Sequence, residues 1–116
     1  MEQKKFHGAF VFRYQGHGIL SSTYLNSDQL RPHPETALLK GDKFEEDNFL
    51  GLFETIWLEE NTTAIIRIEL EITTHQDNQE VYNLTWSDRN ENGQSNFEGI
   101  GMLEKDLLVG CYWKVH

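Results

Sequence analysis

The sequence predicts an all-β protein, a small antiparallel meander barrel of about eight strands. Three observations predict this fold class. Apolar and polar residues alternate with period two over residues 64–74 and again over residues 81–87, the pattern of strands with one buried face. Short polar or glycine-containing segments separate the apolar segments, as hairpin turns do. Glycines recur on one face of a later segment, which suits the sharp coiling of a small barrel.

Residues 64–74 form the clearest predicted strand. Positions with the same parity, odd or even, lie on the same face of a strand. In this segment the odd parity holds the charged residues Arg67, Glu69 and Glu71, and the even parity holds apolar residues. Since side chains of a strand alternate between two faces, we expect the apolar parity to be buried and the charged parity to be exposed. The apolar parity consists of Ile66, Ile68, Leu70 and Ile72.

Residues 81–87 repeat the alternation and complete a hairpin with that strand. Tyr82, Leu84 and Trp86 share one face, and polar residues take the other. The connection over residues 75–80 is polar and of hairpin type. The two segments are therefore predicted to be antiparallel neighbours.

The C-terminal segments over residues 97–104 and 107–115 predict a second hairpin, with residues 105–106 as a two-residue turn. Gly99 and Gly101 share one parity of the first strand. Glycine inside a strand marks a bulge, a bend or the close approach of another backbone. The second strand has one apolar face made of Leu107, Val109, Cys111, Trp113 and Val115.

The N-terminal half is less regular. Residues 6–14 and 18–26 are predicted strands, joined by a turn at residues 15–17 in which glycine supplies a positive φ. Residues 27–35 are predicted to be a loop, because Pro32 and Pro34 exclude a regular helix or a central strand.

Two further segments complete the N-terminal half. Residues 36–44 predict a strand interrupted at residues 41–42. Residues 49–58 allow two interpretations, since Phe49, Phe53, Ile56 and Trp57 have helix-like spacing after a capping Asp47. We favour a strand there, because the pattern F-x-G-x-F occurs at residues 6–10 and 49–53, and F-x-G recurs at residues 97–99.

Seven or eight short strands can form a closed up-and-down barrel or a two-sheet sandwich. Short consecutive turns without a long crossover favour the barrel, and closure also removes exposed strand edges. At 116 residues the whole chain, residues 1–116, is predicted to be one domain.

The formal net charge of −9 restricts the partners. Nucleic acids and anionic membranes are bound through Lys and Arg, so neither is an expected partner. The single cysteine allows no internal disulfide, and the N-terminal residues lack the apolar segment of a signal peptide. We therefore expect a cytoplasmic protein.

Four segments of the C-terminal part carry a resemblance to known barrels: residues 51–53 (Gly-Leu-Phe), 82–86 (Tyr-Asn-Leu-Thr-Trp), 97–101 (Phe-Glu-Gly-Ile-Gly) and 111–113 (Cys-Tyr-Trp). Through them residues 51–114 resemble the calycin group of lipocalin, fatty-acid-binding and avidin-like barrels. The resemblance implies a barrel that binds a small apolar ligand in its mouth, without catalysis in most members. The chain is shorter than true lipocalins, and residues 8–10 read Gly-Ala-Phe where lipocalins carry Gly-x-Trp.

Aromatic residues are the candidate ligand contacts. Aromatic side chains can line an apolar pocket with polar tips, and they can equally fill a solid core. Trp86 is expected near a barrel rim, because it ends its predicted strand. The residues predicted to bind ligand are Trp86, Tyr82, Trp57, Trp113 and Phe12.

No catalytic, metal or cofactor site is predicted. Residues 88–93 match the first half of a calcium loop, but the twelfth position is Gly99 instead of glutamate, and an ordinary turn explains the same residues. The histidines show no metal-ligand spacing. Cys111 is interpreted as a small buried hydrophobe.

The function predicted first is non-catalytic binding of a small apolar molecule in the barrel mouth. The alternative is a protein-interaction module with a filled barrel, in which the outer strand over residues 107–115 forms a homodimer face. A third possibility is an enzyme in which a tyrosine or glutamate performs acid–base chemistry inside a cavity.

Overall fold

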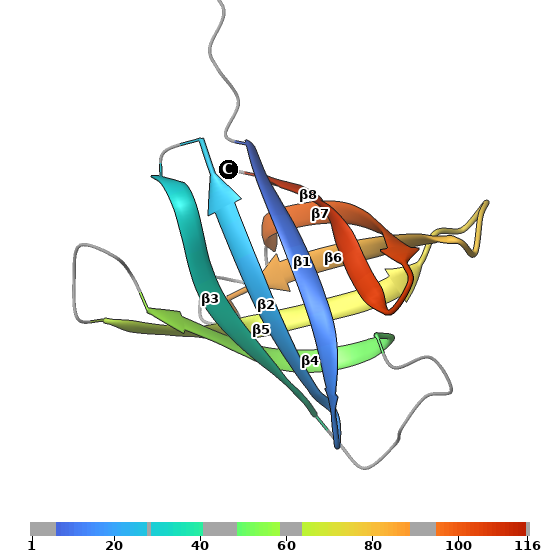
Figure 1. Cartoon of the computed structure of the whole chain (residues 1–116), viewed down its shortest axis with the longest axis horizontal. Helices are drawn as coiled ribbons and strands as arrows, with labels where there is room; N and C mark the ends of the chain where they lie inside the picture. The colour runs from blue at the N-terminus through green and yellow to red at the C-terminus, as the bar shows by residue number, and fades with distance from the viewer. Residues whose placement is uncertain (1–6, 28, 41–48, 59–63, 89–94, 116) are drawn as a thin grey trace, which may run out of the picture.

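Eight strands in simple chain order form a closed antiparallel barrel in the computed structural model (Figure 1). The structure describes residues 7–27, 29–40, 49–58, 64–88 and 95–115. The strands are β1 (His7–Gly16), β2 (Ile19–Asn26), β3 (Gln29–Leu39), β4 (Gly51–Leu58), β5 (Ile65–Thr74), β6 (Val81–Ser87), β7 (Ser95–Glu104) and β8 (Leu107–Lys114).

Each strand pairs with its neighbours in the chain, and β1 also pairs with β8 to close the barrel. This topology confirms the predicted meander barrel and excludes the two-sheet sandwich. It is compatible with the fold that the calycin resemblance implies. The segment with two interpretations is a strand, β4. Within the described ranges, no helix has the length and hydropathy needed to cross a membrane.

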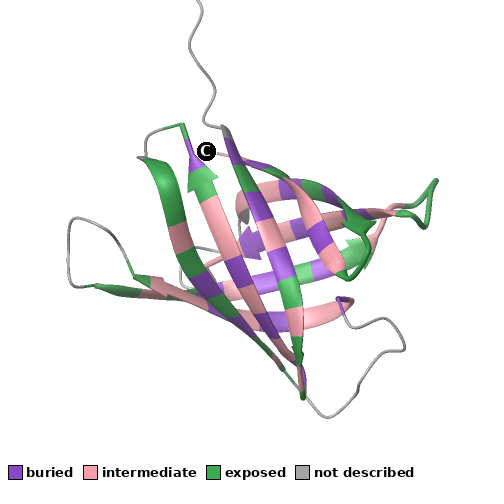
Figure 2. Ribbon diagram, viewed as in Figure 1, coloured by how far each residue is buried: buried purple, intermediate pink, exposed green. Residues whose placement is uncertain are grey.

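The alternation of β5 is confirmed over most of the strand. Leu70 and Ile72 are fully buried and Ile68 is buried, whereas Arg67 and Glu71 are exposed. Ile66 and Glu69 are only half-buried, so the predicted burial of the first and the predicted exposure of the second are wrong. Figure 2 shows the same alternation of buried and less buried residues along most of β1 and along β6. The inward faces of the eight strands therefore supply a single core.

Two tight turns are also confirmed, the first at residues 17–18 instead of 15–17. His17 and Gly18 connect β1 to β2, and both have positive φ, 54° and 74°. Positive φ at both central residues is the requirement of a type I′ hairpin turn, whose twist matches that of the strands. The second turn, residues 105–106, connects β7 to β8, and Lys105 has φ 56°.

The prediction of a loop over residues 27–35 is wrong, because β3 begins at Gln29 and contains both Pro32 and Pro34. Among the described residues, β4 pairs only with Thr36–Leu39, so the earlier half of β3 has one unpaired edge. A proline at such an edge removes no ladder hydrogen bond. Figure 1 shows β3 and β4 diverging over this half.

The interpretation of Cys111 as buried is also wrong, because Cys111 is exposed. The inward residues of β8 are Leu108 and Tyr112, with Gly110 between them. Both faces of this strand are apolar, so the pattern alone could not choose the inward one. Pairing chooses it, because Gly110 lies opposite Phe10 of β1.

The glycines of β7 make room for aromatic rings, which agrees with the predicted close approach. A Cβ on Gly99 would lie 3.1 Å from Cζ3 of Trp86, and one on Gly101 would lie 3.4 Å from Cζ of Phe10. Both glycines are buried on the inward face. Because β7 has no side chain at these two positions, the rings of Phe10 and Trp86 can lie close to its backbone.

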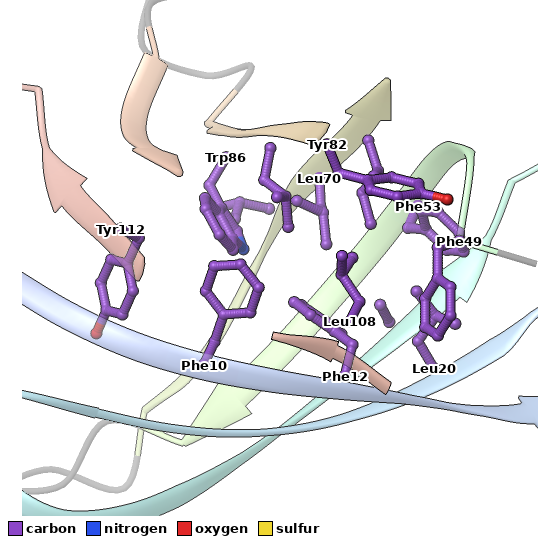
Figure 3. Packing of buried hydrophobic residues seen from close by; sticks show 14 residues of the cluster. Phe10, Phe12, Leu20, Phe49, Phe53, Leu70, Tyr82, Trp86, Leu108 and Tyr112 are labelled. Carbon is purple, nitrogen blue, oxygen red and sulfur yellow. The ribbon is translucent and has the colours of Figure 1, made fainter. Parts of the chain in front are cut away.

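The two ends of the barrel differ in chemistry. We call them the Tyr112 end, where β1 begins and β8 ends, and the Tyr82 end, where β6 begins (Figure 3). The Tyr82 end is filled by apolar side chains, among them Phe53, Leu20 and Ile72. Polar groups enter the interior toward the Tyr112 end. Four buried polar residues lie in the described part of the chain: Ser22, Asn26, Glu35 and Thr55.

Candidate functional site

A carboxyl group lies inside the barrel. Glu35 of β3 is only 6% exposed, and it is the one acidic or basic side chain classed as buried among the described residues. It faces inward because it shares its parity with buried Ala37. It is also the residue next to Thr36, where the pairing of β3 with β4 ends. Glu35 therefore lies where the two strands begin to diverge.

Two neutral donors hold the carboxyl in place. The indole N–H of Trp86 donates to Oε2 of Glu35 over 3.1 Å, and the hydroxyl of Thr55 donates to the same oxygen. Thr55 comes from the neighbouring strand β4, whereas Trp86 comes from β6. The indole bond therefore crosses the interior between facing walls of the barrel.

Ser22 is the third polar neighbour of this carboxyl. It lies opposite Glu35 in the pairing of β2 with β3, and it is 3% exposed. Its hydroxyl is close enough to favour the charged form of Glu35. Even so, no described residue meets Oγ of Ser22 at hydrogen-bonding geometry. A buried hydroxyl without a partner is uncommon, because its desolvation is then uncompensated.

Burial raises the pKa of Glu35 above its usual value of 4.5, because the charged form loses its hydration inside the barrel. The contacts with Thr55, Trp86 and Ser22 oppose this shift, in that order of size, but they do not cancel it. None of the ion pairs seen among the described residues includes Glu35. The described residues thus place no cation beside this carboxyl group.

Aromatic rings lie next to one another at the Tyr112 end, and one of them is Trp86, the donor to Glu35. The ring of Tyr112 lies 5.8 Å from Trp86, 5.9 Å from Phe97 and 6.4 Å from Tyr24, measured between centroids. The amide of Asn26 donates to the Tyr112 hydroxyl over 3.3 Å. These contacts connect β8, β6, β7 and β2 around one end of the barrel.

Gly8 explains how Tyr112 reaches across the sheet. Gly8 lies on β1 between its partners Tyr112 of β8 and Asn26 of β2. A methyl group on Gly8 would overlap the Tyr112 ring, so the ring lies directly over this glycine. The missing side chain lets the hydroxyl of a β8 residue contact β2.

The pairing of β2 with β3 orders the site in layers. Ser22 lies opposite Glu35, and the next inward pair toward the Tyr112 end is Tyr24 opposite His33. The rings of that pair are 5.6 Å apart. Glu35 therefore lies one layer deeper than a pair of half-buried rings. Trp57 shares the inward parity of Thr55 and is also half-buried.

The five residues predicted to bind ligand do not form one group. Trp86 is 5% exposed and its N–H is used by Glu35, so it is not the accessible rim residue that was expected. Tyr82 lies at the opposite end of the core from Trp86 (Figure 3). Phe12 is fully buried, and Trp113 shares the outward parity of exposed Cys111. Of the five, Trp57 and Trp86 belong to the layers around Glu35.

Sequence analysis missed Glu35, Ser22, Thr55 and Tyr112. Glu35 lay in the predicted loop, where the prolines concealed the alternation of His33, Glu35 and Ala37. A signal for Tyr112 was Gly8, because a glycine within a strand indicates that a neighbouring ring or backbone comes close, and the ring over Gly8 is that of Tyr112.

Other candidate sites receive no support. Residues 89–94, which hold most of the calcium-like turn, lie outside the described residues. The described part of the chain contains no group of three His, Cys, Asp or Glu side chains arranged around a metal ion. Comparison of the chain with protein-family models, curated proteins and solved structures finds no match.

Proposed function

We propose that this protein is a non-catalytic binding module for a small, largely apolar molecule, bound at the Tyr112 end and anchored at Glu35. One observation carries the proposal: a buried carboxyl group is held by Trp86 and Thr55 inside a barrel whose buried side chains are mostly apolar. Eight-stranded barrels can hold one small ligand. Binding sites of this kind are mostly apolar and contain a few fixed polar groups.

Stability does not account for Glu35. Burying a carboxyl group is costly, and apolar residues in place of buried charged groups are often neutral or stabilising. Residues with perturbed pKa values are concentrated at functional sites. The neutral groups around Glu35 fix its orientation and do not act as a second acid or base, so anchoring a ligand is a simpler use than acid–base catalysis.

The half-buried rings near Glu35 are the proposed ligand contacts. Four of these side chains are half-buried: Tyr24, His33, Trp57 and Phe97. Each has an aromatic ring, and three of them also carry a polar group. Such side chains can cover an apolar ligand and still contact its polar end.

A fluorescent probe tests this proposal. We expect the neutral probe N-phenyl-1-naphthylamine to brighten on binding and to bind more weakly to Tyr24→Ala. The matched control is Tyr14→Ala, because Tyr14 is also a half-buried tyrosine packed on the core but lies near the other end of β1. A probe that does not bind, or two variants with equal effects, would contradict the proposal.

A second candidate function is self-association through the outer face of β1, β8 and β7, together with the adjoining Leu25 of β2 and Val81 of β6. Two cross-strand rows on this face contain no charged side chain, although the chain has a net charge of −9. Apolar faces of two copies can meet without bringing like charges together. The rows are Leu25, Ala9, Cys111 and Ile100, and beside them Val11, Val109, Met102 and Val81.

Light scattering as a function of concentration tests this second candidate. We expect a dimer whose dissociation constant rises in Ile100→Lys and stays unchanged in Ile65→Lys. Ile65 is a suitable control because it is 64% exposed on β5, away from the two rows. A monomer at all concentrations would exclude a homodimer as the functional form.

A further inference from the structure

We propose that the group recognised by Glu35 is an ammonium group, so that the ligand is an organic amine with an apolar body. This inference rests on the proposed function and specifies its substrate class. Three observations support it: the neutral hydrogen-bond donors of the carboxyl group, the acceptor atoms of Glu35 and Ser22, and the aromatic rings at the Tyr112 end.

No cationic side chain in the described part of the chain forms an ion pair with the carboxyl group. Its two hydrogen-bond donors, Thr55 and Trp86, are both neutral. A buried carboxylate is stable when it is paired with a positive charge, and it takes up a proton when it is not. A ligand ammonium group would supply the missing charge, and the bond would be stronger than one between neutral groups.

Two further atoms are positioned to accept hydrogen bonds. The bonds from Thr55 and Trp86 both end on Oε2 of Glu35, so neither of them uses Oε1. Oγ of Ser22 beside the carboxyl is buried, and no described residue donates a hydrogen bond to it. An ammonium group has several donors, so one N–H can be accepted by Oε1 and another by Oγ of Ser22. A neutral hydroxyl has one donor and cannot satisfy both.

The rings and the overall charge also favour a cation. Trp86, Tyr112 and Tyr24 are joined in a chain of ring contacts of 5.8 Å and 6.4 Å. Aromatic faces attract cations within about 6 Å, most strongly when water is excluded. The net charge of −9 attracts cationic ligands and repels anions.

Calorimetric titration with 2-phenylethylamine and its neutral counterpart 2-phenylethanol tests the ligand class. At pH 7 we expect the amine to bind about tenfold or more tightly, as a charged hydrogen bond implies. In Glu35→Gln the preference should disappear while the affinity for the alcohol is kept. Ser22→Ala, which leaves Glu35 in place, should weaken binding of the amine alone.

The pH dependence gives an independent readout. Amine binding requires the ionised carboxylate, so its affinity should rise as the pH passes the raised pKa of Glu35 and then level off. Other titratable groups on the inward faces around it are Tyr24 of β2, His33 of β3 and Tyr112 of β8. β4 and β6 contribute Thr55 and Trp86, which do not titrate. Any pH dependence that persists in Glu35→Gln belongs to those other groups.

Failure of this inference differs from failure of the proposed function. If the alcohol binds as tightly as the amine, or if the preference survives in Glu35→Gln, the ligand is not recognised as an ammonium group, although the module still binds. If affinity falls with rising pH, the protonated acid is the anchor. If neither compound nor the neutral probe binds, the proposed function itself is wrong.

Discussion

The indole N–H of Trp86 donates a hydrogen bond of 3.1 Å to Oε2 of Glu35, from β6 across the barrel interior to β3. The two residues are 51 positions apart in the chain. This bond joins facing walls at the level where the apolar core ends and the half-buried rings begin. It connects the stability of the barrel to the chemistry of the candidate site.

Replacing Trp86 by phenylalanine should destabilise the protein. The ring is retained but the donor to Glu35 is lost, which costs about 1–3 kcal/mol for a buried group left without its partner. Urea unfolding measures the change. Trp113→Phe is the matched control, because Trp113 lies on the outward parity of β8, and we expect its effect to stay below about 0.5 kcal/mol. Equal effects at the two sites would contradict the role of the indole bond.

Glu35→Gln should change how stability depends on pH. Below pH 4.5 both folded and unfolded chains carry the Glu35 proton, so the stability of the neutral form is fully present. As the pH rises, the unfolded chain ionises first, and the stability difference between wild type and Glu35→Gln should fall. It should level off above the raised folded pKa.

Urea unfolding at several pH values measures this difference. At each pH the free energy of unfolding of Glu35→Gln is subtracted from that of the wild type. This removes the contribution of the other carboxylates, because both proteins contain them. A difference that rises with pH would mean that the folded pKa is lowered, and the site would then contain a cation that the described residues do not show.

Leu70→Ala should cost about 2–5 kcal/mol, because Leu70 is fully buried on the inward face of β5. The same measurement on Ile65→Ala provides the control, since Ile65 lies on the same strand and is largely exposed. A cost at Leu70 under about 0.5 kcal/mol would place it at the surface and contradict the face assignment of the strand.

Gly8→Ala should destabilise the barrel through Tyr112. The new methyl group would overlap the tyrosine ring, which must then leave its position over β1. In the double variant Gly8→Ala/Tyr112→Ala the clash is absent, so the two costs should not add. Additive costs in urea unfolding would show that the ring does not lie over Gly8.

Cys111 should react with a thiol reagent in the folded protein, because its side chain is exposed on the outward face of β8. We expect one equivalent of Ellman's reagent to be consumed without denaturant, and the same amount after unfolding. A thiol that reacts only after unfolding would reverse the face assignment of β8.

Sequence patterns predicted the fold through segments in which only one face can be buried. In β5, Arg67 and Glu71 alternate with apolar residues, so a single orientation of the strand is possible. The glycines of β7 likewise indicated the close approach that Trp86 and Phe10 make. Short turns between such strands then left the meander barrel as the simplest closed arrangement.

The candidate site depended on pairings that no local pattern contains. Glu35, Thr55 and Trp86 come from three strands, and the barrel brings them together because it closes with one particular register. The ring contacts of Tyr112 arise in the same way. Residues separated by several strands have no periodic relation in the chain, so their contact could not be predicted.

The sequence by itself determined the strands other than β3 and, where charged and apolar residues alternate, the buried face, because a row of charged side chains cannot enter an apolar core. Only the tertiary structure decided the inward face of β8, since both of its faces are apolar and the pairing of Gly110 with Phe10 selects one. It also decided that Pro32 and Pro34 belong to a strand, because β4 leaves their half of β3 unpaired among the described residues. The divergence of β3 and β4 begins beside Glu35. The strand register of the closed barrel turns Glu35 inward and brings Thr55 and Trp86 to its carboxyl group. This register is the physical reason that a carboxyl group lies there.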